Sequence, residues 1–208
     1  MKTGTLVQKL ETLAWKWKLG SLEDNGLAFL SESFVGYVDI HSYLGWHLSL
    51  SSYMLPENAV IENDDAPHPS LKPGFETAVK IADKLGCLSL CLDTGHAGIT
   101  GENIIEIWDR YGERIKVIHF SDYKADSTDL KKEHRPPGEG DLPLGEFLQA
   151  VYETDQKRKE RGKDEIIIII ELMPIGRWNL RGIPLGLNHQ TNLDRVRRTH
   201  DFILEHIA

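Results

Sequence analysis

The stretch LSLCLDTGHAG, residues 88–98, sets a run of apolar residues directly against an acid and brings a histidine three positions later. The apolar run is typical of a buried strand, and Asp93 would stand at its carboxyl end. Gly95 lets the chain turn tightly, so that His96 returns toward the acid. The stretch therefore predicts a polar site at the end of a sheet.

Strands and helices alternate on both sides of this stretch. Strands are predicted at 59–62, 88–93, 115–120 and 166–174, and helices at 75–86, 102–112, 145–162 and 191–208. Strands separated by helices of ten or more residues indicate parallel strands with crossover helices. An α/β barrel or a doubly wound sheet follows. The isoleucine run near residue 168 predicts a strand covered on both faces, because the sequence of a half-exposed strand would alternate between apolar and polar residues.

The first 58 residues give a weaker pattern. A helix is expected in LVQKLETLAWKWKL, residues 6–19, and a strand in FVGYVDI, residues 34–40. An eight-stranded barrel usually needs about 250 residues, whereas this chain has 208. We expect one domain over 1–208, with a shortened or irregular N-terminal region at 1–58. His41 is either a site residue or a buried structural imidazole.

Composition bounds the class of protein. The chain is 40% hydrophobic and carries a net charge of -8, which fits one soluble domain and argues against binding to nucleic acid. The sequence has no apolar run of about 20 residues, so no membrane span and a cytoplasmic location are expected. Cys87 and Cys91 are predicted as buried thiols. The basic stretches 157–163 and 195–198 are expected on solvated helix faces.

Four strands end in side chains that bind metals. Glu62 and Asp93 each close a predicted strand, Glu171 closes the isoleucine run 166–170, and His119 comes near the end of the strand at 115–120. In a parallel α/β fold these ends share one face. Three carboxylates packed together would repel one another unless a cation lies between them. The set predicts one divalent ion, Mn²⁺, Co²⁺, Zn²⁺ or Mg²⁺, although any one of these residues alone has the plainer interpretation of a cap or a core residue.

The same residues carry a family resemblance. VIEND (60–64), LDTGH (92–96), IHFSDY (118–123), HRPPGEGDLPL (134–144) and IIIELMP (168–174), in this order, resemble the xylose isomerase-like TIM-barrel superfamily. That superfamily holds sugar isomerases and epimerases together with endonuclease IV. The resemblance implies a TIM-barrel-like parallel barrel with Glu62, Asp93, His119 and Glu171 as metal ligands.

The resemblance also implies roles in a reaction. Glu62 and Glu171 would both bind the ion and exchange the substrate's proton, while His96 would face the substrate or a second metal. His134 is a second substrate-binding candidate, and it matches a position that ligates an additional zinc in the endonuclease branch. Two positions depart from the family, because Lys132 replaces an aspartate of that branch and Ala125 replaces an arginine of the epimerases. Asp122 either orients His119 or caps a loop.

Three functions follow as hypotheses. The first is a metal-dependent isomerase or epimerase that moves a proton on a small sugar or related polyhydroxy carbonyl compound. The second is a metal-dependent phosphodiesterase of the endonuclease IV type, against which the acidic charge and Lys132 count. The third is a non-catalytic barrel relative, in which a shortened N-terminal region leaves a sheet edge that a second subunit covers, giving a homo-oligomer.

Overall fold

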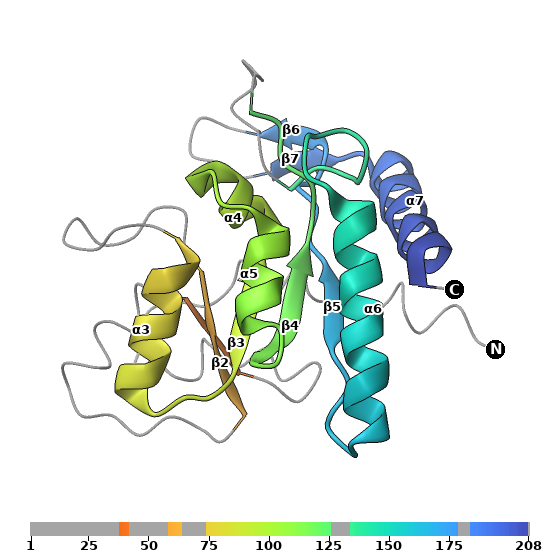
Figure 1. Ribbon diagram of the computed structural model, residues 1–208. Helices are drawn as coiled ribbons and strands as arrows, with labels where there is room; N and C mark the ends of the chain where they lie inside the picture. Colours follow the sequence, from red (N-terminus) through yellow and green to blue (C-terminus); the bar gives the residue numbers. More distant parts are fainter. Residues whose placement is uncertain (1–37, 42–57, 64–73, 126–133, 179–183, 208) are drawn as a thin grey trace.

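The computed structural model describes residues 38–41, 58–63, 74–125, 134–178 and 184–207. Its centre is a parallel sheet of five strands in chain order (Figure 1). The strands are β1 (Val38–His41), β2 (Ala59–Glu62), β3 (Leu90–Asp93), β4 (Ile115–Phe120) and β5 (Ile167–Ile170). Because neighbouring strands all run the same way, their carboxyl ends lie at one edge of the sheet.

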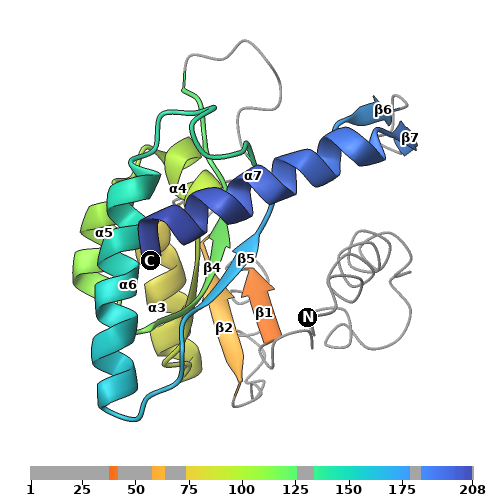
Figure 2. The same cartoon turned by 90° about the vertical axis from the view of Figure 1, so that its right-hand side faces the viewer.

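Helices follow β2, β3 and β4 and cover one face of the sheet, and a last helix ends the described chain (Figure 2). They are α3 (Phe75–Leu85), α4 (Thr94–Thr100), α5 (Ile104–Tyr111), α6 (Leu144–Glu160) and α7 (His189–Ile207). Glycine ends α3 at Gly86 and α4 at Gly101, both in the left-handed region. Among the described helices, none is both long and apolar enough to cross a lipid bilayer.

The strands divide their side chains between two faces with a period of two. One set, which includes Ile61, Leu92 and Ile118, belongs to the main apolar core that packs against the helices. The alternate set forms a smaller cluster of Val60, Cys91, Val117 and Ile169. Each member of this smaller cluster is followed two positions later by a predicted ligand, which lies on the same face by the strand period. These ligands are Glu62, Asp93, His119 and Glu171. The strand period thus places all four predicted ligands on the face opposite the helices.

The predicted alternation of parallel strands and helices is confirmed. The strands at 59–62 and 115–120 have the predicted bounds, and the predicted helices at 75–86 and 145–162 differ from α3 and α6 by one or two residues at their ends. Of the predicted strand 34–40, only 38–40 is described, within β1. The predicted helix at 6–19 lies outside the described residues, as does most of the N-terminal region at 1–58. A single domain over 1–208 therefore stays a prediction.

Two elements were not predicted. The chain forms the helix α4 immediately after Asp93, where a tight turn at Gly95 was expected. Asp93 is the N-cap of this helix, because its side chain accepts a hydrogen bond from the backbone amide of His96. An antiparallel hairpin of β6 (Gly176–Trp178) and β7 (Pro184–Leu187) precedes α7. Its sequence lacks a periodic apolar pattern, so only the local backbone pairing reveals it.

The isoleucine run does not form a fully covered strand. All four residues of β5 are only partly buried, and β5 stands at one edge of the described sheet. Ile168 and Ile170 pack toward the main core, whereas Ile169 packs against the smaller cluster. The prediction that both faces of this strand are covered is therefore wrong over the described residues.

The basic stretches are only partly solvated. Arg158 on α6 is completely buried, and its Nη1 donates to the Ile115 carbonyl at 2.8 Å. Arg195 on α7 is also buried, while Lys157 and Arg197 are exposed. The expectation that both stretches lie wholly on solvated faces is thus wrong at these two arginines.

Candidate metal centre

The four predicted metal ligands converge. Glu62, Asp93, His119 and Glu171 each offer a ligand atom, and these atoms lie within 4.8 Å of one another. Glu62 and Asp93 end β2 and β3, Glu171 directly follows β5, and His119 is the penultimate residue of β4. Parallel pairing sets Asp93 level with His119, so the sheet register itself brings these two side chains together.

His119 stands between two carboxylates. Its Nδ1 is 3.1 Å from Glu62 Oε1 and 3.0 Å from Glu171 Oε2. Burial by itself would lower the pKa of His119, but interactions with Cys91 and Glu62 and a hydrogen bond to Glu171 raise it well above the ordinary value of 6.5. The metal-free centre therefore favours a proton on Nδ1, at the atom that would bind an ion.

Asp93 is the least solvated member of the centre. Its side chain is completely buried, and Oδ2 has no hydrogen-bond partner. Burial raises the pKa of Asp93 to about 6, the charge of His96 opposes that change, and the nearby Glu62 and Glu171 add to it. A buried carboxylate oxygen without a donor is costly unless a cation meets it. The donor set of three carboxylates and one imidazole therefore fits a divalent ion.

Glu62 and Glu171 differ in their access to solvent. The Glu62 side chain is 1% exposed, whereas the Glu171 side chain is 37% exposed. Although burial opposes it, the hydrogen bond and charge of His119 hold the pKa of Glu171 below its ordinary value of 4.5. Glu171 is therefore the ionised carboxylate of the centre that a molecule from solvent can reach.

Asn63 supports the centre and was not predicted. Its side-chain amide donates to the Asp93 carbonyl at 3.0 Å, and its Oδ1 accepts from the Asp93 amide at 2.8 Å. The Asn63 carbonyl lies 2.9 Å from His96 Nδ1. Asn63 thus ties the end of β2 to Asp93 and His96. Its place directly after Glu62 was the only signal in the sequence.

His96 and His134 form a second group with Asp93. The three offer ligand atoms within 4.8 Å of one another, and the two imidazole rings meet edge to face with centroids 5.6 Å apart. A Cβ added at Gly95 would lie 2.9 Å from Ser121 Oγ, so any larger residue there would require the Ser121 hydroxyl to move. The structure therefore brings both predicted substrate-binding histidines to the edge of the centre.

Asp122 holds the loop that carries His134. Its carboxylate accepts hydrogen bonds from four backbone amides, those of Tyr123, Gly138, Gly140 and Leu142. His134 has φ of 53°, an uncommon value for a residue other than glycine, and its carbonyl accepts from the Met173 amide at 2.9 Å. Of the two predicted roles for Asp122, the loop cap is the one that the described contacts support.

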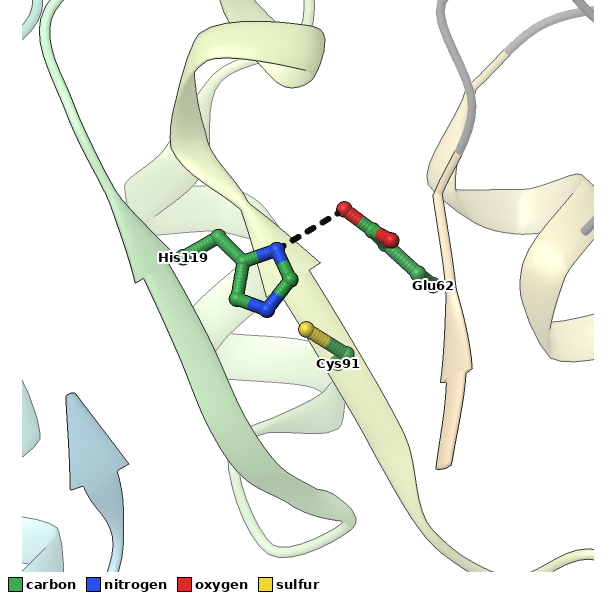
Figure 3. A group of neighbouring side chains, drawn as sticks. All are labelled: Glu62, Cys91 and His119. Atoms are coloured by element: carbon green, nitrogen blue, oxygen red, sulfur yellow. Dashed lines mark hydrogen bonds and ion pairs between the residues drawn. The ribbon is translucent and has the colours of Figure 1, made fainter. Parts of the chain in front are cut away.

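Cys91 is a further neighbour of the centre that the metal prediction did not include. Its thiol forms no disulfide and is completely buried. Figure 3 shows its sulfur beside the His119 ring, across from Glu62, and ligand atoms of these three residues also lie within 4.8 Å of one another. The prediction that both cysteines are buried thiols is confirmed. The side chain of His41 lies outside what the structure describes.

Comparison with known proteins identifies relatives. A family model described as xylose isomerase-like TIM barrel matches residues 58–181. An inosose dehydratase of Lacticaseibacillus casei is 30% identical over 106 residues, covering 42% of this chain and 35% of the relative. An inosose dehydratase of Clostridium beijerinckii is 38% identical over 73 residues, covering 32% of this chain and 24% of the relative. A probable endonuclease 4 of Mycobacterium leprae is 25% identical over 136 residues, covering 61% and 54%. The chain thus spans about half or less of the length of these relatives.

Proposed function

Since the chain belongs to the xylose isomerase-like TIM-barrel family, we propose that it is a divalent-metal-dependent enzyme that moves a proton next to the carbonyl group of a small sugar-like compound. Isomerases and epimerases of polyhydroxy carbonyl compounds share this step. Removal of water from a polyhydroxylated ketone also begins with loss of a proton next to the carbonyl group. Two of the relatives are named for the dehydration of an inosose. The convergence of the four ligand side chains is the observation that carries the proposal.

In this proposal Glu62, Asp93, His119 and Glu171 hold the ion. The ion would polarise the substrate carbonyl and so acidify the neighbouring C–H bond. Glu171 is the base, because its carboxylate is ionised at neutral pH and is the more exposed of the two glutamates. Glu62 is the second proton carrier, at the end of a different strand.

The histidines position the substrate in the same proposal. His96 Nδ1 faces the Asn63 carbonyl at 2.9 Å. In the neutral form of His96, a hydrogen bond to that carbonyl would place the ring proton on Nδ1 and leave Nε2 as an acceptor for a substrate hydroxyl. His134 lies beside it and approaches Ser121 Oγ through Nδ1 at 3.5 Å. The substrate would therefore meet two imidazoles beside the ion.

Exchange with solvent deuterium tests the proposal. Metal-loaded protein is incubated in D₂O with ketoses, ketose phosphates and inososes, and each compound is followed by NMR for deuterium uptake and for loss of water. We expect metal-dependent uptake that Glu171→Gln abolishes. Glu153→Gln, at an exposed glutamate on α6, is the matched control and should leave uptake unchanged. Equal uptake by the Glu171 variant would rule out its role as the base.

The second candidate function is metal-dependent phosphodiester cleavage. It is favoured by the group of Asp93, His96 and His134, which offers a place for another ion, and by the similarity to a probable endonuclease 4. The net charge of -8 and Lys132 still argue against a nucleic-acid surface. Cleavage of an abasic duplex by the metal-loaded protein, together with no deuterium uptake by any carbonyl compound, would replace the first proposal with this one.

A further inference from the structure

Cys91 is the sulfur-bearing member of the smaller apolar cluster next to the candidate metal centre. The other members of its cluster are Val60, Val117 and Ile169, one each from β2, β4 and β5. Parallel pairing sets Cys91 level with Glu62, and Asp93 follows two residues later on the same face of β3. The Cys91 sulfur therefore lies in the layer directly beneath the proposed ligands.

The orientation of the His119 ring indicates a role for this sulfur. Nδ1 is the nitrogen that lies near Glu62 and Glu171, at 3.1 and 3.0 Å. Ligand atoms of Cys91, Glu62 and His119 lie within 4.8 Å of one another. Figure 3 shows the sulfur on the side of the ring's other nitrogen, away from the contact with Glu62. The imidazole therefore has carboxylates beside one nitrogen and the sulfur on the side of the other.

We propose that Cys91 is a positioning residue for His119, whose Nε2–H donates to the sulfur so that the Nδ1 lone pair is directed at the ion. The inference rests on the proposed metal centre. Histidines that bind metals generally donate their second ring N–H to an acceptor, which fixes the tautomer and the ring orientation, and loss of that acceptor typically costs about 10–100-fold in metal affinity. Among the described residues, Cys91 is placed for this task, because its sulfur lies on the Nε2 side of the ring while Glu62 and Glu171 lie beside Nδ1.

The test compares zinc binding and ring protonation among four proteins. Cys91→Val removes the acceptor while nearly preserving volume, and Cys91→Ser restores an acceptor. Cys87→Val is the matched control, because Cys87 is the other buried thiol and precedes β3, at the opposite end of that strand from Asp93. Zinc affinity is measured by competition with a chromophoric chelator. Nitrogen-15 NMR of the zinc-loaded proteins identifies the protonated nitrogen of His119.

We expect the wild-type protein to carry zinc on Nδ1 and a proton on Nε2. Cys91→Val should weaken zinc binding by about 10–100-fold, Cys91→Ser should recover part of that loss, and Cys87→Val should bind as the wild type does. Zinc affinity and ring protonation unchanged in Cys91→Val would overturn the inference, with the metal centre intact. A sulfur-to-metal charge-transfer band in the cobalt protein would also overturn it, by making Cys91 a ligand. No metal bound by the wild type would overturn the proposed centre as well.

Discussion

Replacement of Asp93 by asparagine should make the metal-free protein more stable at neutral pH. Asp93 is completely buried with a pKa of about 6, against an ordinary value of 3.8. Each pKa unit corresponds to about 1.4 kcal/mol, so the ionised side chain costs the folded, metal-free protein about 3 kcal/mol above pH 6. Asparagine keeps a side-chain oxygen that accepts the N-cap hydrogen bond from the His96 amide. Asparagine and aspartate stabilise a helix about equally as N-cap residues.

The sign of the pH dependence follows from the raised pKa. The folded state binds this proton more tightly than the unfolded state does, so the stabilising contribution is complete below about pH 3.8 and disappears as the pH rises through about 6. The asparagine side chain of Asp93→Asn cannot ionise. The stability of the variant should therefore equal that of the wild type near pH 4 and exceed it by about 3 kcal/mol near pH 7.5.

Urea denaturation of the metal-stripped proteins at the two pH values measures this difference. Asp109→Asn, at an exposed position on α5, is the control and should change the free energy of unfolding by less than about 0.5 kcal/mol. Zinc at about 1,000 times its dissociation constant would stabilise the wild type by about 4 kcal/mol, which would make the wild type more stable than Asp93→Asn. An Asp93→Asn protein less stable than the wild type at both pH values, without metal, would refute the electrostatic reasoning.

Three further predictions test the surroundings of the centre. Asp122→Ala should lower the free energy of unfolding by about 3 kcal/mol, because four backbone amides lose a charged acceptor. Urea denaturation measures the loss, and a change below about 0.5 kcal/mol would contradict the prediction. Arg158→Met should leave stability unchanged or raise it by about 1 kcal/mol, because Nε and Nη2 of this buried arginine have no hydrogen-bond partner; a loss of more than about 2 kcal/mol in thermal unfolding would show that the charge is needed. Metal affinity should fall as the pH is lowered from about 8 to about 5, because the ion displaces protons from His119 and, below about pH 6, from Asp93. Calorimetry in two buffers of different ionisation enthalpy should detect this proton release. No proton release on metal binding at neutral pH would contradict the proposed ligands.

The sequence predicted those features of the molecule that follow from periodicity and parallel topology. Glu62, Asp93 and His119 converge because each lies at the carboxyl end of a strand in one parallel sheet, which the alternation of apolar strands and amphipathic helices already indicates. Glu171 joins them from the segment after β5. Parallel pairing alone is enough to bring these strand ends together.

Most of the missed features depend on contacts or packing that no local sequence pattern specifies. Asn63 bonds to a residue 30 positions away, and the contact of Cys91 with His119 depends on how the ring turns. The helix α4 was missed because TGHAGIT has low helix propensity, while the Asp93 cap and the fit of its glycines against neighbouring side chains favour it in the fold. Arg158 looked like a solvated residue because burial of a cation is decided by packing and not by its neighbours in sequence.

The position of a bound ion tests the central claim most directly. Diffraction data from zinc-loaded crystals, collected on both sides of the zinc absorption edge, would locate the metal by its anomalous signal. We expect one ion with His119 Nδ1 and oxygens of Glu62, Asp93 and Glu171 as ligands, at about 2.0–2.2 Å. An ion held by Asp93, His96 and His134 alone, or no ion within reach of His119, would contradict the proposed centre.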